Sequence, residues 1–259
     1  MNFYQQLIIR KKAYLAIEKE KIPFETLVQM IPSEIETRDF VKSIEPRNNS
    51  AISIIGDIKG IPLPITENKL KVVPVTIAIA FQSAKAKAIA VNPDEFRHMP
   101  NFSVDKIHRS TSIPIISTEL IVEEYQIYRT LMQGFDAFRI FAINLSFTEI
   151  GRFVELASRL KMAIICECVT KADVDKAYQA GVRIISVRNI PIKLSSSMVE
   201  NSILLKKFIP NDCISISHGN VRNNFQVRQL EEITYDAIML DEIIIRQIDI
   251  PKAIKELLQ

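Results

Sequence analysis

Charged side chains recur in this sequence where short apolar runs end. Asp57 and Lys59 follow the first such run, Glu167 lies near the end of a later one, and Arg188 and Asn189 come at the end of the next. A lysine and a carboxylate that face each other across a pocket can transfer protons as general acid and general base. The same residues can also form a structural network of ion pairs, and the sequence alone favours neither interpretation.

Further polar candidates follow the last two apolar runs, namely Ser217, His218, Gly219, Asp241 and Glu242. A lone histidine at such a place is more often a hydrogen-bonded structural residue than a catalytic one, so we expect a structural role for His218. No spacing among the acidic residues and His218 specifies a site for a divalent metal. We therefore expect no metal and no cofactor.

The apolar runs that carry these residues are short and spread along the whole chain. Each is rich in Ile, Val, Ala or Phe and is too short for a typical helix, which favours parallel strands buried on both faces. The expected strands lie at 51–55, 86–91, 113–116, 135–142, 163–168, 183–187, 213–217 and 236–240.

Helical patterns fill most of the gaps between these strands. Capping-box sequences begin at Ser146 and Thr170, and Gly134 and Gly181 end helices just before the next strand. Further helices are expected at 3–19, 74–84, 103–110, 123–133, 197–208, 223–232 and 251–258.

Eight strands that alternate with eight helical connections predict an α/β fold, a closed (β/α)8 TIM barrel with an extra N-terminal helix. The alternative is an open doubly wound sheet, which usually has a glycine-rich first turn that residues 56–60 lack. No linker or repeat divides the chain, so we expect residues 1–259 to form a single TIM-barrel domain. The irregular stretch at 60–73 then lies on the catalytic face of the barrel.

Strand parity predicts which side chains enter the open end of the barrel. Because alternate residues of a strand face opposite ways, an inward Glu167 places Cys166 and Cys168 against the outer helices. We expect both cysteines to be small buried hydrophobes, since their spacing is not that of a zinc site. The same parity puts Asp57 and Lys59 together at the open end.

The composition excludes several classes of function. The net charge is +3 over 259 residues, with both signs mixed along the chain, which argues against nucleic acid as a partner. Three cysteines cannot form a disulfide framework, and the longest apolar run, residues 72–81, is too short to span a bilayer. We expect a cytoplasmic protein with no membrane partner. With six glycines, the chain has few places for a glycine-built phosphate site.

Several segments resemble indole-3-glycerol phosphate synthase, a lyase and the barrel enzyme of tryptophan biosynthesis. ISTELIVEEYQIYRTLMQGFDAF is similar to the family's segment in which Lys-Asp-Phe is followed by Asp-Glu-Tyr-Gln-Ile-Tyr. GDIKGIPLP resembles its Glu-Ile-Lys…Ser-Pro-Ser opening, and ICECVTKADVDKAYQAGVRIISVRN resembles its Val-Glu-Val-His…Ile-Asn-Asn-Arg stretch. The resemblance covers essentially the whole chain, and Glu-Tyr-Gln-Ile-Tyr is its most specific part.

The resemblance implies an activity and a set of residues for it. The family closes an indole ring on a carboxyphenylamino-deoxyribulose phosphate, with loss of carbon dioxide and water. The positions that match the family's site imply catalytic roles for Lys59, Glu167, Asp57 and Asn189, and substrate-binding roles for Arg188, Ser217 and Gly219. Three of these positions differ from the family's residue: Asp57 stands for a glutamate, Arg188 for an asparagine and Ser217 for a glutamate.

Other positions of the family's site are changed. The strand-three lysine, which is the family's general acid, falls on Thr118, and a hydroxyl cannot replace an ammonium group. The glycine and serine of the phosphate site fall on Asp241 and Glu242, whose charges repel a phosphate. Another phosphate-site serine falls near Pro62, which has no N–H to donate. The acid and the phosphate site are therefore both expected to be damaged.

Three functions stay open, and we rank them in this order. The first is a pseudoenzyme that has lost the ring-closing reaction and binds or regulates, with a small molecule or an unidentified protein as its partner. The second is an active indole-3-glycerol phosphate synthase, a carboxy-lyase with a rearranged site. The third is a different lyase or a metal-assisted enzyme that uses Asp57, Lys59, Glu167 and Arg188 on the same barrel.

Overall fold

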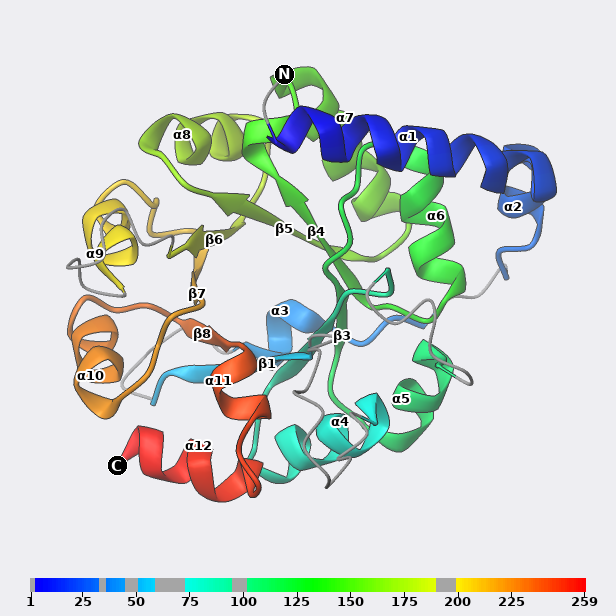
Figure 1. Cartoon of the computed structure of the whole chain (residues 1–259). Helices are drawn as coiled ribbons and strands as arrows, with labels where there is room; N and C mark the ends of the chain where they lie inside the picture. Colours follow the sequence, from blue (N-terminus) through cyan, green and yellow to red (C-terminus); the bar gives the residue numbers. More distant parts are fainter. Residues whose placement is uncertain (1–2, 33–35, 45–50, 59–72, 95–101, 190–198) are drawn as a thin grey trace.

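The chain folds into a closed barrel of parallel strands that pair in sequence order (Figure 1). The ring closes where β1 pairs with β8. The strands are β1 (Ser53–Ile58), β2 (Ala88–Val91), β3 (Ile115–Ser117), β4 (Ala137–Phe141), β5 (Ala163–Cys168), β6 (Ile184–Arg188), β7 (Ile214–His218) and β8 (Ala237–Leu240). The predicted (β/α)8 barrel is confirmed.

The computed structural model describes residues 3–32, 36–44, 51–58, 73–94, 102–189 and 199–259. Helices surround the strands on the outside of the barrel (Figure 1). They are α4 (Pro74–Ser83), α5 (Val104–Ser110), α6 (Glu124–Met132), the 3-10 helix η1 (Ala142–Asn144), α7 (Phe147–Arg159), α8 (Lys171–Gln179), α9 (Glu200–Lys206), α10 (Asn224–Glu232), α11 (Glu242–Ile245) and α12 (Ile250–Leu258). None of the described helices is long and apolar enough to cross a membrane.

Among the residues that the structure describes, three helices precede β1. They are α1 (Phe3–Lys21), α2 (Phe24–Gln29) and α3 (Phe40–Ser43). The sequence patterns predicted only the first of them. In α3, Phe40 is 1% exposed and packs with Ile44 among the residues that fill the inside of the barrel, so α3 closes the barrel at one end. A single short turn leaves no periodic pattern in the sequence, which is why α3 was not predicted.

Alternate strand residues pack into two separate cores. Ile55, Ile165 and Met239 belong to the core inside the barrel, where small alanines from β2, β4 and β8 make room for them. Cys166 and Cys168 belong to the larger core between the strands and the outer helices. The predicted parity of β5 is therefore confirmed, and all three cysteines of the chain are free and buried.

The predicted end of the first strand was wrong. The apolar pattern predicts an end at residue 55, whereas β1 continues through Gly56 and Asp57 to Ile58. Gly56 is needed because Phe81 of α4 packs flat against the strand at that point: a Cβ there would lie 2.4 Å from the Phe81 Cγ atom. The glycine thus permits close packing and does not break the strand.

The predicted helix signals are confirmed at four places. Ser146 and Thr170 each form a complete capping box with the acidic side chain three residues later. Gly134 and Gly181 end α6 and α8 with φ of +88° and +98°, a left-handed conformation that glycine adopts at little cost.

Candidate functional site

The carboxyl-terminal end of the barrel, which we call the mouth, holds a network of ion-paired side chains. Asp57 of β1, Arg139 of β4, Glu167 of β5, Arg188 of β6 and His218 of β7 meet there through ion pairs. All except Arg188 are at most 6% exposed. A buried network of this kind is stable only if each charge is paired, and here each charge is paired.

Glu167 is the centre of this network, and both of its carboxylate oxygens accept hydrogen bonds. Its Oε2 accepts hydrogen bonds from Arg139 Nη1 at 2.9 Å and from His218 Nδ1 at 2.9 Å. Its Oε1 accepts one from Arg188 Nη1 at 3.2 Å. Internal partners therefore occupy three of the roughly four acceptor sites of this carboxylate.

These partners also set the charge of Glu167. Burial by itself raises the pKa of Glu167, but the positive charges of Arg139, His218 and Arg188 outweigh it and hold the pKa far below its usual range. A carboxylate with so low a pKa stays ionised near neutral pH and is a weak base. As arranged, Glu167 serves as a counter-ion.

His218 lies between two carboxylates. Because Glu167 is ionised and can only accept, His218 Nδ1 is the donor in their hydrogen bond, and His218 Nε2 lies 3.4 Å from Asp57 Oδ2. The side chain is 2% exposed. The predicted structural role of His218 agrees with this geometry, since neither ring nitrogen points to open solvent.

Arg139 is the one member of this network that was not predicted from the sequence. It comes from β4, and its Nη2 donates to the Thr118 backbone oxygen at 2.9 Å. It therefore brings a positive charge to the tip of β3, next to Thr118, on which the resemblance places the family's lysine. A signal was present, because an arginine in the middle of a buried strand must point inward unless it is to lie among the apolar helices.

Three of the predicted residues bind one another at the edge of the mouth instead of facing into it. Asn189 is 4% exposed, and its Nδ2 donates to Ser217 Oγ at 3.0 Å and to the Gly219 backbone oxygen at 3.1 Å. Its Oδ1 accepts from the N–H and the hydroxyl of Ser202 in α9, at 3.0 and 2.9 Å. Every polar atom of this amide is used in joining β6, β7 and α9.

The predicted damage to the phosphate site has a geometric counterpart. Gly219 has φ of +78°, and a Cβ there would lie 3.2 Å from Asp241 Oδ2. The Asp241 carboxylate therefore lies against the glycine, at the start of α11. This carboxylate places a negative charge at the position that the resemblance assigns to the substrate phosphate.

The structure brings together some predicted residues and not others. Asp57, Glu167 and Arg188 meet in the mouth. Asn189, Ser217 and Gly219 form a separate hydrogen-bonded group beside it. Lys59 and Pro62 lie outside the described residues, as does nearly all of the 60–73 stretch. Thr118 is 4% exposed, and its backbone oxygen binds Arg139. In the described part of the chain, no group of three or more His, Cys, Asp or Glu side chains is arranged to hold a metal ion.

Comparison with known proteins gives one family. Residues 4–257 match the family described as indole-3-glycerol phosphate synthase. Relatives with that description include one from Campylobacter jejuni, which is 29% identical over 255 residues, or 96% of this chain and 97% of its own. Another, from Alkaliphilus metalliredigens, is 25% identical over 253 residues, or 97% and 96% of the two chains.

A solved structure shares the fold at lower similarity. The N-acetylmannosamine-6-phosphate 2-epimerase from Clostridium perfringens matches with a TM-score of 0.59 over 81% of this chain and 92% of its own. Its sequence is 12% identical, so this likeness concerns the fold alone.

Proposed function

This chain belongs to the indole-3-glycerol phosphate synthase family, and from that premise we propose that it is a pseudoenzyme. In this proposal the barrel no longer closes the indole ring and acts by binding a small molecule or a protein partner. The main support comes from Glu167, to which the resemblance assigns a catalytic role. Both of its oxygens accept hydrogen bonds from within the protein, from Arg139, His218 and Arg188.

The state of Glu167 supports the loss of the reaction in two ways. A catalytic acid or base needs a pKa near the working pH, whereas the positive charges around Glu167 hold its pKa far below that range. A substrate would also have to displace a buried arginine from Glu167 and leave its positive charge without a carboxylate, which is strongly unfavourable. The geometry therefore favours a carboxylate with a structural role.

The Asp241 carboxylate supports the loss of phosphate binding. It lies against Gly219, where the resemblance places the substrate phosphate. Two negative charges about 4 Å apart repel by roughly 1 to 4 kcal/mol near a protein surface. A phosphate dianion is therefore expected to bind weakly at this end of the barrel.

The second candidate is an active synthase with a relocated cation, and Arg139 is the observation that favours it. Its guanidinium lies at the tip of β3, where the family has its lysine. An arginine can stabilise a developing negative charge, but it does not give up its proton near neutral pH and so is a poor general acid. This candidate therefore ranks below the pseudoenzyme.

A binding experiment tests the proposal without relying on turnover. The protein is titrated with the carboxyphenylamino-deoxyribulose phosphate in a calorimeter, alongside Asp241→Asn and the surface control Asp105→Asn. We expect no saturable binding by the wild type or by Asp105→Asn, and a measurable gain in affinity for Asp241→Asn, because that change removes one repelling charge. Tight binding by the wild type that Asp241→Asn leaves unchanged would contradict the proposal.

A further inference from the structure

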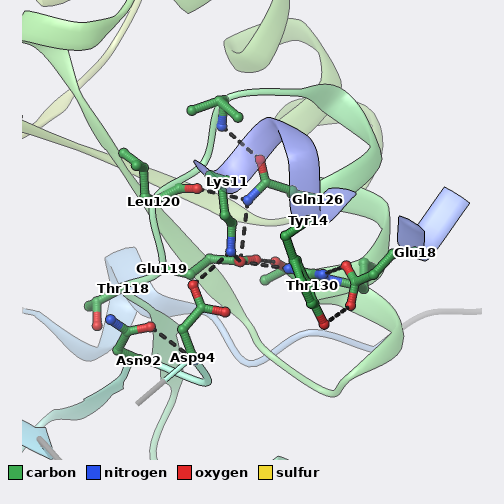
Figure 2. Close-up of polar contacts among 12 residues, drawn as sticks. Lys11, Tyr14, Glu18, Asn92, Asp94, Thr118, Glu119, Leu120, Gln126 and Thr130 are labelled. Carbon is green, nitrogen blue, oxygen red and sulfur yellow. Dashed lines mark hydrogen bonds and ion pairs between the residues drawn. The ribbon is translucent and has the colours of Figure 1, made fainter. Parts of the chain in front are cut away.

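A second cluster of buried charges lies outside the mouth, where α1 meets the barrel. Figure 2 shows Lys11 of α1 between Asp94, which follows β2, and Glu119, which follows β3. The Lys11 Nζ atom donates to Asp94 Oδ2 at 2.7 Å and to Glu119 Oε2 at 2.6 Å. Lys11 is 7% exposed and Glu119 is fully buried, so water does not weaken this contact.

Arg129 of α6 extends the cluster back to α1. Its Nη2 donates to Glu119 Oε2 at 2.6 Å, and its Nη1 donates to Glu18 of α1, which also accepts from Tyr14. Glu119 thus lies between one cation from α1 and one from α6. Removal of either cation would leave a buried carboxylate short of a partner.

The apolar contacts that hold α1 are few by comparison. Among the described side chains of α1, only those of Lys11 and Leu15 are buried. Leu15 packs with Leu27 of α2 and with Val122 and Tyr125 of the β3–α6 segment, in a cluster separate from both barrel cores. An element with so little apolar contact belongs to the part of a protein that opens at low free-energy cost.

The packing beside the cluster is also incomplete. A cavity of about 440 Å³ lies between α1 and the barrel, lined by Tyr14 and Glu18 of α1 and by Arg129 and Met132 of α6. Atoms that face a cavity lack the contacts that close packing gives. The ion pairs of Lys11 and Arg129, with that of Lys19 to Glu123, are therefore the main polar contacts that position α1 on the barrel.

We propose that α1 and α2 form a strap that opens as one unit while the barrel stays folded, with the Lys11–Glu119–Arg129 cluster as its latch. This device is independent of whether the ring-closing reaction has been lost. The latch lies next to the mouth in the sequence. Glu119 accepts from Lys11 of the strap, and the residue before it, Thr118, accepts from Arg139 through its backbone oxygen. The latch and the buried charges of the mouth therefore meet at one dipeptide.

Native-state hydrogen exchange of the full chain tests the opening. We expect the amides of α1 and α2 to exchange through an opening that depends less on denaturant than the exchange of β1 to β8, because only a small surface is exposed. If α1, α2 and the strands share one exchange free energy and one denaturant dependence, the strap does not open by itself and the proposal is wrong.

Three variants test the latch. Lys11→Met should speed exchange in α1 roughly a hundredfold, since it leaves Glu119 and Asp94 buried with one cation fewer. The double variant Lys11→Met with Glu119→Gln should recover most of the protection, and Lys12→Met, an exposed lysine on the same turn, should exchange like the wild type. Equal effects of Lys11→Met and Lys12→Met would overturn the proposal. So would a Lys11→Met protein that cannot fold, because the cluster would then support the barrel and not the strap.

Discussion

Glu167 decides how the mouth is interpreted, because a carboxylate can be a base or a counter-ion but hardly both at once. Its two oxygens accept hydrogen bonds from two arginines and from His218, and it is 2% exposed. Burial without partners would raise its pKa and make it a better base, as happens at many catalytic carboxylates. Arg139, together with His218 and Arg188, therefore favours the counter-ion role for Glu167.

Arg139→Met tests how much the buried pair matters. We expect the free energy of unfolding to fall by about 3 to 5 kcal/mol, because Glu167 keeps its charge and loses a buried arginine partner. Urea denaturation measures the loss. The control is Arg183→Met, since Arg183 is 49% exposed and pairs with the exposed Asp212, and it should cost less than about 1 kcal/mol. Similar losses for the two variants would mean that Arg139 is not a structural partner of Glu167.

The pH dependence of stability tests the charge state of Glu167. Its pKa in the folded protein lies well below the ordinary value of 4.5, so its contribution to stability is complete above that value and is lost as the pH falls through the folded pKa. The difference in unfolding free energy between the wild type and Glu167→Gln should therefore shrink on acidification below about pH 4.5. Glu256→Gln, at a side chain that is 64% exposed, serves as the control. A difference that grows on acidification would contradict the assignment.

At the scale of elements, the mouth depends on the close fit of each strand to its helix. The contact of Gly56 in β1 with Phe81 in α4 holds the strand that carries Asp57. Gly56→Ala should destabilise the protein by about 3 kcal/mol or more, since the methyl group has no space unless Phe81 moves. Gly151→Ala in α7 is the matched control: nothing lies within 4 Å of its added Cβ, so it should stabilise by about 0.5 to 1 kcal/mol. Thermal unfolding distinguishes the two, and equal effects would contradict the packing argument.

The sequence allowed the elements to be predicted better than their contacts. Buried parallel strands and capping boxes leave local patterns, so the barrel and the boxes at Ser146 and Thr170 could be predicted. The extension of β1 beyond residue 55 could not, because residues 56–58 pair with β2, which lies about 30 residues further along the chain. Arg139 could have been found from its place in a buried strand. Its three-way contact with Thr118 and Glu167 requires the closed barrel.

At the scale of the whole molecule, the barrel of the family is kept, and two charged side chains lie beside residues to which the resemblance assigns a role. Arg139 pairs with Glu167 on one side, and Asp241 lies against Gly219 on the other. The resemblance assigns catalysis to Glu167 and substrate binding to Gly219. Fold and family membership therefore do not by themselves fix the activity of this chain.

The most direct test of this account is a turnover measurement. Purified protein at high concentration is mixed with the carboxyphenylamino-deoxyribulose phosphate, and the fluorescence of the indole product is followed beside a Lys59→Ala, Glu167→Ala double variant. The account predicts no product from well-folded wild type, and the same trace from the double variant. Product from the wild type that disappears in the double variant would contradict it, because Lys59 and Glu167 would then be working catalytic residues.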